Sequence, residues 1–110
     1  MGLIKSEIYN KEHNELAALF KVLAHPARIA ILEHLFKLNT CICGDLVKEI
    51  GLAQPTISQH LKELKNLGII KGTINGTSVC YCIAYDKWHS LSKMTTAFFD
   101  RTYLNQNSTC

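Results

Sequence analysis

The stretch that decides the fold is Asp45–Leu67, which reads DLVKEIGLAQPTISQHLKELKNL. Asp45 is a good N-cap for a short helix, and Gly51 marks the tight turn that follows it. Pro55 then opens a second, longer helix. In that helix, apolar residues recur on one narrow face: Ile57, Leu61 and Leu64. A short helix, a glycine turn and a longer helix together predict a helix-turn-helix.

The outer face of the second helix carries side chains that suit the edges of DNA bases. Glutamine offers a paired donor and acceptor to adenine, while serine and threonine bond to bases or phosphates. Lysines further along suit phosphate oxygens. The predicted DNA-binding set is Gln54, Thr56, Ser58, Gln59, His60, Lys62, Lys65, Lys71, Asn75 and Thr77. The alternative is that these residues are simply the solvated face of an amphipathic helix.

Upstream, helical periodicity predicts two helices, over 11–24 and 26–37, which are separated at His25-Pro26. The buried stripe expected in the second of them is Ile29, Leu32, Leu35 and Phe36. A short alternating run over 40–43 then predicts a strand.

Downstream, two strand-like runs over 69–74 and 78–84 meet at Asn75-Gly76, which is a strong hairpin signal. Asp86 is expected to cap a final helix. In that helix, five residues recur at coiled-coil-like spacing: Trp88, Leu91, Thr95, Phe98 and Thr102. The predicted fold class is mainly α with a small β-sheet (α+β), in the order helix, helix, strand, helix, helix, hairpin, helix.

The composition narrows the functional classes. The chain has 110 residues, which supports one domain, expected over 1–104 and followed by a flexible tail over 105–110. The formal net charge of +3 permits a polyanionic partner without requiring one. The sequence contains no membrane-spanning run and no secretory signal, so a cytoplasmic protein is expected. Nor does any carboxylate pair, phosphate loop or nucleophile–base combination indicate an enzyme.

Four of the five cysteines form two Cys-x-Cys pairs on the predicted strands, Cys41/Cys43 and Cys80/Cys82. Alternate residues of a strand share a face. We therefore expect each pair to face outward. The residues that alternate with these cysteines are expected to point toward the core, and they are Ile42, Val79, Tyr81 and Ile83.

Two blocks of the sequence resemble the ArsR/SmtB-type family of repressors. The blocks are LAHPARIAIL over 23–32 and GLAQPTISQHLKEL over 51–64, and LGII over 67–70 is similar to the start of that family's wing. The resemblance covers about 11–104. It implies a winged helix-turn-helix and a homodimeric bacterial repressor that releases operator DNA when it senses a metal, a metalloid or a redox signal.

In this family the dimer interface is formed by the first and last helices. The resemblance therefore implies an interface that contains Leu16, Leu19, Trp88, Leu91, Thr95, Phe98 and Thr102. Twofold symmetry would place two reading helices in successive major grooves, roughly 34 Å apart, on an imperfect palindrome of double-stranded DNA.

In a winged helix the strand before the third helix pairs with the second wing strand, which would bring Cys41, Cys43, Cys80 and Cys82 together. Four thiolates suit zinc, cadmium, copper(I) or As(III), and neighbouring thiols also oxidise to a disulfide. The alternative is that these cysteines only fill surface positions. Gly44 shifts the first pair by one residue from the family's metal-binding position, so that site is not carried over.

Two other functions stay open at this point. One is a regulator of the same family with no metal response. The other is a zinc or redox interaction protein that has kept the fold but no longer reads DNA.

Overall fold

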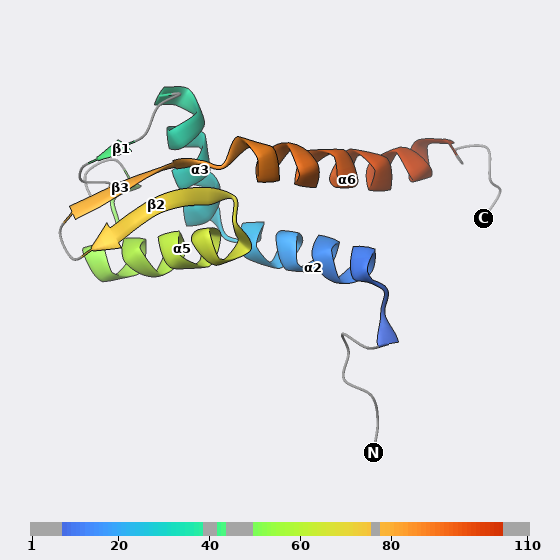
Figure 1. Cartoon of the computed structure of the whole chain (residues 1–110), viewed down its shortest axis with the longest axis horizontal. Helices are drawn as coiled ribbons and strands as arrows, with labels where there is room; N and C mark the ends of the chain where they lie inside the picture. The colour runs from blue at the N-terminus through green and yellow to red at the C-terminus, as the bar shows by residue number, and fades with distance from the viewer. Residues whose placement is uncertain (1–7, 39–41, 44–49, 76–77, 105–110) are drawn as a thin grey trace, which may run out of the picture.

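The computed structural model describes residues 8–38, 42–43, 50–75 and 78–104, without the side chains of 42–43, 73–75, 78–79 and 102–104. Its elements are α2 (Lys11–Leu23), α3 (Pro26–Leu38), β1 (Ile42–Cys43), α5 (Gln54–Leu67), β2 (Ile70–Asn75), β3 (Ser78–Ile83) and α6 (Tyr85–Leu104). Figure 1 shows the hairpin of β2 and β3 beside α5 at one end, with α2 and α6 extending toward the other. The predicted fold class is confirmed. Among the described helices, none is long and apolar enough to cross a membrane.

The two N-terminal helices begin where the sequence predicts. The Asn10 side chain accepts a hydrogen bond of 2.8 Å from the backbone N–H of His13, which caps α2. In α3, however, the predicted buried stripe is wrong at one position. Ile29 is 39% exposed and Ile31 is fully buried instead. Ile31 lies one turn before the buried Leu35, so these two share the face that α5 covers.

Helix α5 is the second helix of the predicted helix-turn-helix. It begins at Gln54, with Pro55 in its first turn, and it ends at Gly68, whose φ of 90° is left-handed. The predicted short helix before Gly51 falls mostly on residues outside the described ranges. Helix α6 begins two residues earlier than a cap at Asp86 would give, because the Trp88 N–H bonds to the Ala84 carbonyl at 2.9 Å. Asp86 therefore lies inside the first turn of α6 and does not cap it.

The sheet is antiparallel, with the strand order β1-β3-β2. The hairpin register pairs Asn75 with Ser78 and Ile70 with Ile83, which confirms the hairpin signal. On the other side of β3, Cys43 lies opposite Cys80. The hairpin tip, with Gly76 and Thr77, lies outside the described residues.

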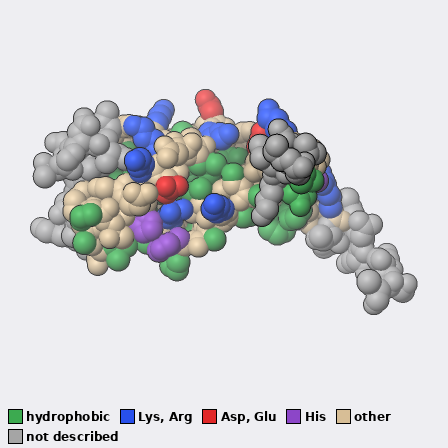
Figure 2. Space-filling view, turned by 90° about the horizontal axis from the view of Figure 1, so that it is seen from below, with side chains coloured by type: hydrophobic (Ala, Val, Ile, Leu, Met, Phe, Trp, Pro, Cys, Tyr) green, Lys and Arg blue, Asp and Glu red, His purple; other side chains and the backbone are tan. Residues whose placement is uncertain are grey.

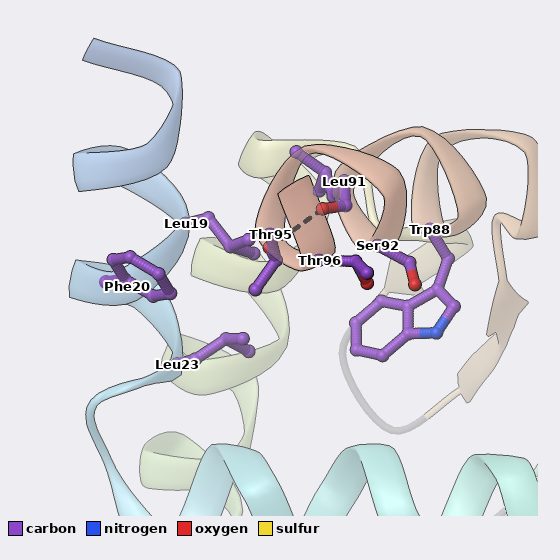
Figure 3. Close-up of a pocket in the computed structure, with 8 residues that line it drawn as sticks. All are labelled: Leu19, Phe20, Leu23, Trp88, Leu91, Ser92, Thr95 and Thr96. Carbon is purple, nitrogen blue, oxygen red and sulfur yellow. Dashed lines mark hydrogen bonds between the residues drawn. The ribbon is translucent and has the colours of Figure 1, made fainter. Parts of the chain in front are cut away.

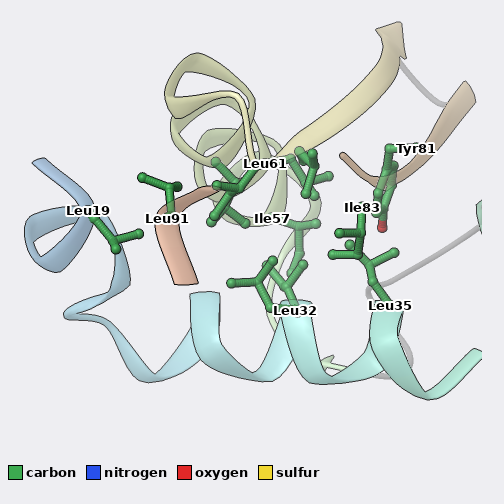
Figure 4. Close-up of a cluster of buried hydrophobic side chains, with 12 residues drawn as sticks. Leu19, Leu32, Leu35, Ile57, Leu61, Tyr81, Ile83 and Leu91 are labelled. Atoms are coloured by element: carbon green, nitrogen blue, oxygen red, sulfur yellow. The ribbon is translucent and has the colours of Figure 1, made fainter. Parts of the chain in front are cut away.

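The core lies where α3, α5 and the sheet meet (Figure 4). Its members come from six elements and from the residue before β2. They are Leu19, Ile31, Leu32, Leu35, Ile57, Leu61, Leu64, Ile69, Ile70, Tyr81, Ile83 and Leu91. Half of them lie in α3 and α5. The core therefore fixes α5 by its inner face and leaves the outer face of that helix to solvent.

Candidate nucleic-acid interface

Helix α5 has one buried face and one exposed polar face. Ile57, Leu61 and Leu64 are at most 1% exposed. On the opposite side, four residues of the predicted DNA-binding set are exposed: Thr56, Gln59, Lys62 and Lys65. Residues three apart differ by roughly 60° around an α-helix, so these four wind across the exposed half of α5. The helix therefore presents a polar edge that begins near its N-terminus and becomes cationic toward its C-terminus.

Two hydrogen bonds hold the glutamines of this face. The Gln54 amide donates to the Ser58 hydroxyl at 3.2 Å, and the Gln59 amide donates to the Glu63 carboxylate at 3.2 Å. Both bonds join residues one helical turn apart, so each glutamine has one amide group engaged on the helix surface. The role of Glu63 was missed in the sequence, although its position four residues after Gln59 is the signal for such a pair.

Three members of the set belong to the hairpin. Lys71, on β2, is exposed. The Asn75 side chain and the whole of Thr77 lie outside the described parts of the chain. Figure 2 views the molecule from the side of α5 and α2, and it shows lysine and arginine side chains around a group of histidine side chains.

His60 is a correction. It was predicted to lie on the outer face of α5, but it is only 7% exposed. Its Nδ1 accepts a hydrogen bond of 3.1 Å from the Arg28 Nε, and its ring centroid lies 4.4 Å from that of His25. A side chain held in this way cannot reach a base edge. Position 60 lies beside 57, 61 and 64 on the inner face of the helix, and this spacing was the available signal.

The cysteines lie on the neighbouring sheet. Tyr81 and Ile83 are 1% and 3% exposed, while Cys80 and Cys82 are half-buried, which confirms the predicted alternation along this part of β3. Cys80 is disulfide-bonded. Its partner in the backbone register is Cys43. Cys41 lies outside the described residues, and among the described residues no group of three potential metal ligands is present.

The residues of the predicted dimer interface differ in their exposure within a single chain. Leu16, Leu19 and Leu91 are 4–6% exposed in a single chain, so they pack the chain's own core. Trp88 is partly buried and its ring centroid lies 4.9 Å from that of Phe36. Phe98 does lie on the surface, at 40% exposed. The Thr102 side chain is outside the described set.

Two further exposed aromatic residues accompany Phe98. Phe20 on α2 is 37% exposed and Phe99 on α6 is 56% exposed. The ring centroid of Phe20 lies 6.2 Å from each of the other two rings. We call Phe20, Phe98 and Phe99 the aromatic patch.

A pocket of about 220 Å³ separates α2 from α6 next to this patch (Figure 3). Its lining is mostly apolar and consists of Leu19, Phe20, Leu23, Trp88, Leu91, Ser92, Thr95 and Thr96. The Thr95 hydroxyl donates to the Leu91 carbonyl at 2.8 Å and so does not present an unsatisfied donor to the pocket. The two helices therefore leave part of an apolar surface uncovered.

Comparison with known proteins gives consistent matches. The sequence pattern of the family described as "Bacterial regulatory protein, arsR family" matches residues 25–71. A helix-turn-helix transcriptional regulator of Methanocaldococcus jannaschii is 34% identical over 76% of this chain and 94% of its own length. The biofilm growth-associated repressor of Agrobacterium fabrum is 32% identical over 90% of this chain and 84% of its own length.

A solved structure agrees with these matches. The transcriptional repressor BigR from Xylella fastidiosa superposes with a TM-score of 0.58 at 30% identity, covering 83% of this chain and 90% of that one. These matched proteins are named as regulators or repressors of transcription and not as enzymes.

Proposed function

Because this chain belongs to the ArsR family of bacterial regulatory proteins, we propose that it is a sequence-specific repressor that binds operator DNA as a homodimer. The observation that carries the proposal is the exposed polar edge of α5, opposite a fully buried apolar face. A helix held by its buried face can enter the major groove and keep its contacts with the core.

The proposed DNA-binding residues of α5 divide by the chemistry they offer, and Gln54 and Ser58 lie half-buried beside the exposed edge. Gln54, Ser58 and Gln59 are the proposed base-reading group, because amides and hydroxyls match the donors and acceptors of base edges. Lys62 and Lys65 are the proposed phosphate-binding group, because each contributes a cationic charge toward the C-terminal end of α5. The first group sets sequence preference, and the second sets salt-dependent affinity.

The test separates base reading from charge. We expect the triple substitution of Gln54, Ser58 and Gln59 by alanine to abolish the preference for operator over unrelated DNA. It keeps the lysines, so binding to unrelated DNA and its salt dependence should persist. Fluorescence anisotropy over a salt series measures both quantities.

The matched control replaces Ser90, which is exposed on α6, by alanine. It should leave the preference intact. An unchanged preference in the triple variant would contradict the proposal and favour a protein that has kept the fold without reading DNA.

The dimer is proposed to form through the aromatic patch. Three exposed rings from α2 and α6 make a continuous apolar surface. Aromatic residues are enriched at interfaces because their burial is strongly favourable. The operator is accordingly expected to be an imperfect palindrome with two half-sites, one for each α5.

A second proposal concerns the signal, and two observations favour it. Cys43 lies opposite Cys80 in the strand register, and Cys80 is disulfide-bonded. We infer that a thiol-reactive signal acts at these strands, at Cys41, Cys43, Cys80 and Cys82. An oxidant would close a bridge between Cys43 and Cys80. Zinc, cadmium or As(III) would instead need the reduced thiolates.

The oxidation balances with a hydroperoxide as the oxidant. One thiolate attacks the O–O bond, becomes a sulfenic acid and releases water or an alcohol after protonation. The second thiolate then attacks that sulfur and releases water as the S–S bond forms. Two thiols thereby lose two electrons and two protons, and the peroxide takes up both.

Thiol counting tests this second proposal. Of the five thiols of the reduced chain, three should remain titratable after mild peroxide treatment. The Cys80→Ser variant should keep four with or without the oxidant, while Cys110→Ser serves as the matched control and should fall from four to two. Four thiols protected by Zn(II), Cd(II) or As(III) would favour a metal signal. Reactivity unchanged by peroxide and by each metal would overturn both forms of the proposal.

A further inference from the structure

His60 is a buried titratable side chain on a helix otherwise proposed to bind DNA. Its ring contacts His25 from the α2–α3 connection, and its Nδ1 accepts from the Arg28 Nε at 3.1 Å. Arg28 extends the contact, because its Nη1 donates to the Val22 carbonyl of α2 at 3.1 Å. Three helices therefore meet at this group, which we call the Arg28–His60 link.

The hydrogen bond from Arg28 specifies the protonation state of the His60 imidazole. A guanidinium group has only donors, so the His60 Nδ1 that it contacts must carry a lone pair. His60 is therefore neutral, with its proton on Nε2. The Nδ1 of His25 likewise accepts the backbone N–H of Ala27 at 3.1 Å, at the start of α3. Protonating His60 at Nδ1 turns an acceptor into a donor that faces the Arg28 donor.

Acid also destabilises the Arg28–His60 link through charge repulsion. The groups that face His60 are His25 and Arg28, and both repel an added positive charge. Glu63, on α5 itself, is hydrogen-bonded to Gln59. Desolvation by burial, followed by the charges of His25 and Arg28, lowers the pKa of His60 below its usual 6.5. The folded arrangement thus favours the neutral ring.

We propose that the Arg28–His60 link is a pH-dependent positioning device that holds α5 in its DNA-binding orientation while His60 is neutral and releases it in acid. The inference rests on the proposed function, since it concerns the same helix. Neither residue touches DNA in this proposal. They act through the attachment of α5 to α3 and α2.

The direction in which acid changes DNA affinity distinguishes this proposal from a general electrostatic effect. Histidine protonation usually strengthens binding to DNA, because it adds positive charge. Here acid has the opposite effect. A group with a lowered pKa contributes stability that is complete above the unfolded value, about 6.5, and is lost as the pH falls below it.

The experiment compares operator affinity at constant salt from about pH 7.5 to about pH 5.5. We expect the affinity of the wild type to fall at least about fivefold over this range. The His60→Asn variant should show no fall, because its amide oxygen can accept from Arg28 but does not take up a proton. His89→Asn, in which an exposed histidine on α6 is replaced, is the matched control and should follow the wild type.

NMR of the imidazole nitrogens gives a readout that is independent of DNA. The His60 Nδ1 should be unprotonated at neutral pH, and a proton found there would overturn the proposal. A wild type that binds operator at neutral pH with the same pH profile as His60→Asn would overturn this inference alone. A wild type that does not prefer operator at neutral pH would overturn the proposed function together with it.

Discussion

At the scale of single residues, Tyr81 is a core side chain whose hydroxyl is expected to lower the stability of the folded protein. It is 1% exposed, and its hydroxyl has no hydrogen-bond partner among the described residues. A buried hydroxyl without a partner forfeits its hydration without compensation. Burial also raises the pKa of Tyr81 far above its usual value of 10.0, because the phenolate is even harder to bury.

Replacing Tyr81 by phenylalanine should therefore stabilise the protein. We expect the free energy of unfolding to rise by about 1 kcal/mol at neutral pH. The raised pKa adds a pH dependence. Stability is complete below the unfolded value, about 10, and is lost as the pH rises above it. That alkaline loss should be smaller in Tyr81→Phe.

Urea titrations at neutral and alkaline pH measure both effects. Tyr9→Phe is the control, since Tyr9 is 53% exposed and its change should be close to zero. A Tyr81→Phe variant less stable than the wild type at neutral pH would mean that the hydroxyl has a stabilising partner.

At the scale of elements, the pairing of β2 with β3 depends on one glycine. Gly72 has a φ of 134°, and a Cβ built there would lie 2.6 Å from the Tyr81 Cα and would overlap the Cys80 carbonyl oxygen. The obstacle is backbone, which cannot rotate away as a flexible side chain does. The hairpin therefore requires glycine at this position.

We expect Gly72→Ala to lower the free energy of unfolding by about 3 kcal/mol, since it adds a steric overlap to an unfavourable φ. Gly51→Ala isolates the cost of the unfavourable φ. Gly51 has a φ of 83°, but no atom of the described residues lies within 4 Å of its Cβ position, so about 1 kcal/mol should be lost. Denaturant titration of the two variants measures the difference. Equal losses would show that the strand contact can relax.

At the scale of the whole molecule, α2 and α6 bring together an apolar surface that the described residues of one chain leave exposed. The aromatic patch is formed by Phe20 of α2 and two rings of α6, and it adjoins the pocket between those helices. We propose that the same surface of a second copy packs against the patch and the pocket, because a twofold axis makes such a patch self-complementary.

Phe98→Asp should therefore convert a dimer to a monomer in sedimentation velocity, because it would bury an unpaired charge in the interface. Operator affinity should fall by about a hundredfold or more as the two half-sites lose their linkage. Ile29→Asp is the matched control, since Ile29 is 39% exposed and lies on α3, away from the patch. A dimeric Phe98→Asp variant, or a monomeric wild type, would place the interface elsewhere or remove it.

Local signals in the sequence were sufficient for the elements and for part of the site. Pro55 and Gly68 bound α5, and Asn75-Gly76 marks the hairpin, because caps and turns depend on a few neighbouring residues. The alternation of Cys80 to Ile83 followed from the period of a strand in the same way. The sequence by itself therefore determined the order of elements, the family and the polar edge of α5.

Tertiary structure decided which face of each helix is covered. His60 is buried because Arg28 and His25, more than thirty positions earlier, close over it. Leu91 packs inside its own chain because α2 and α5 reach it, which leaves Phe98 and Phe99 on the surface. Periodicity defines a stripe of residues, but the width of the buried sector depends on every element that packs against it. That information is held in long-range contacts, which no local pattern contains.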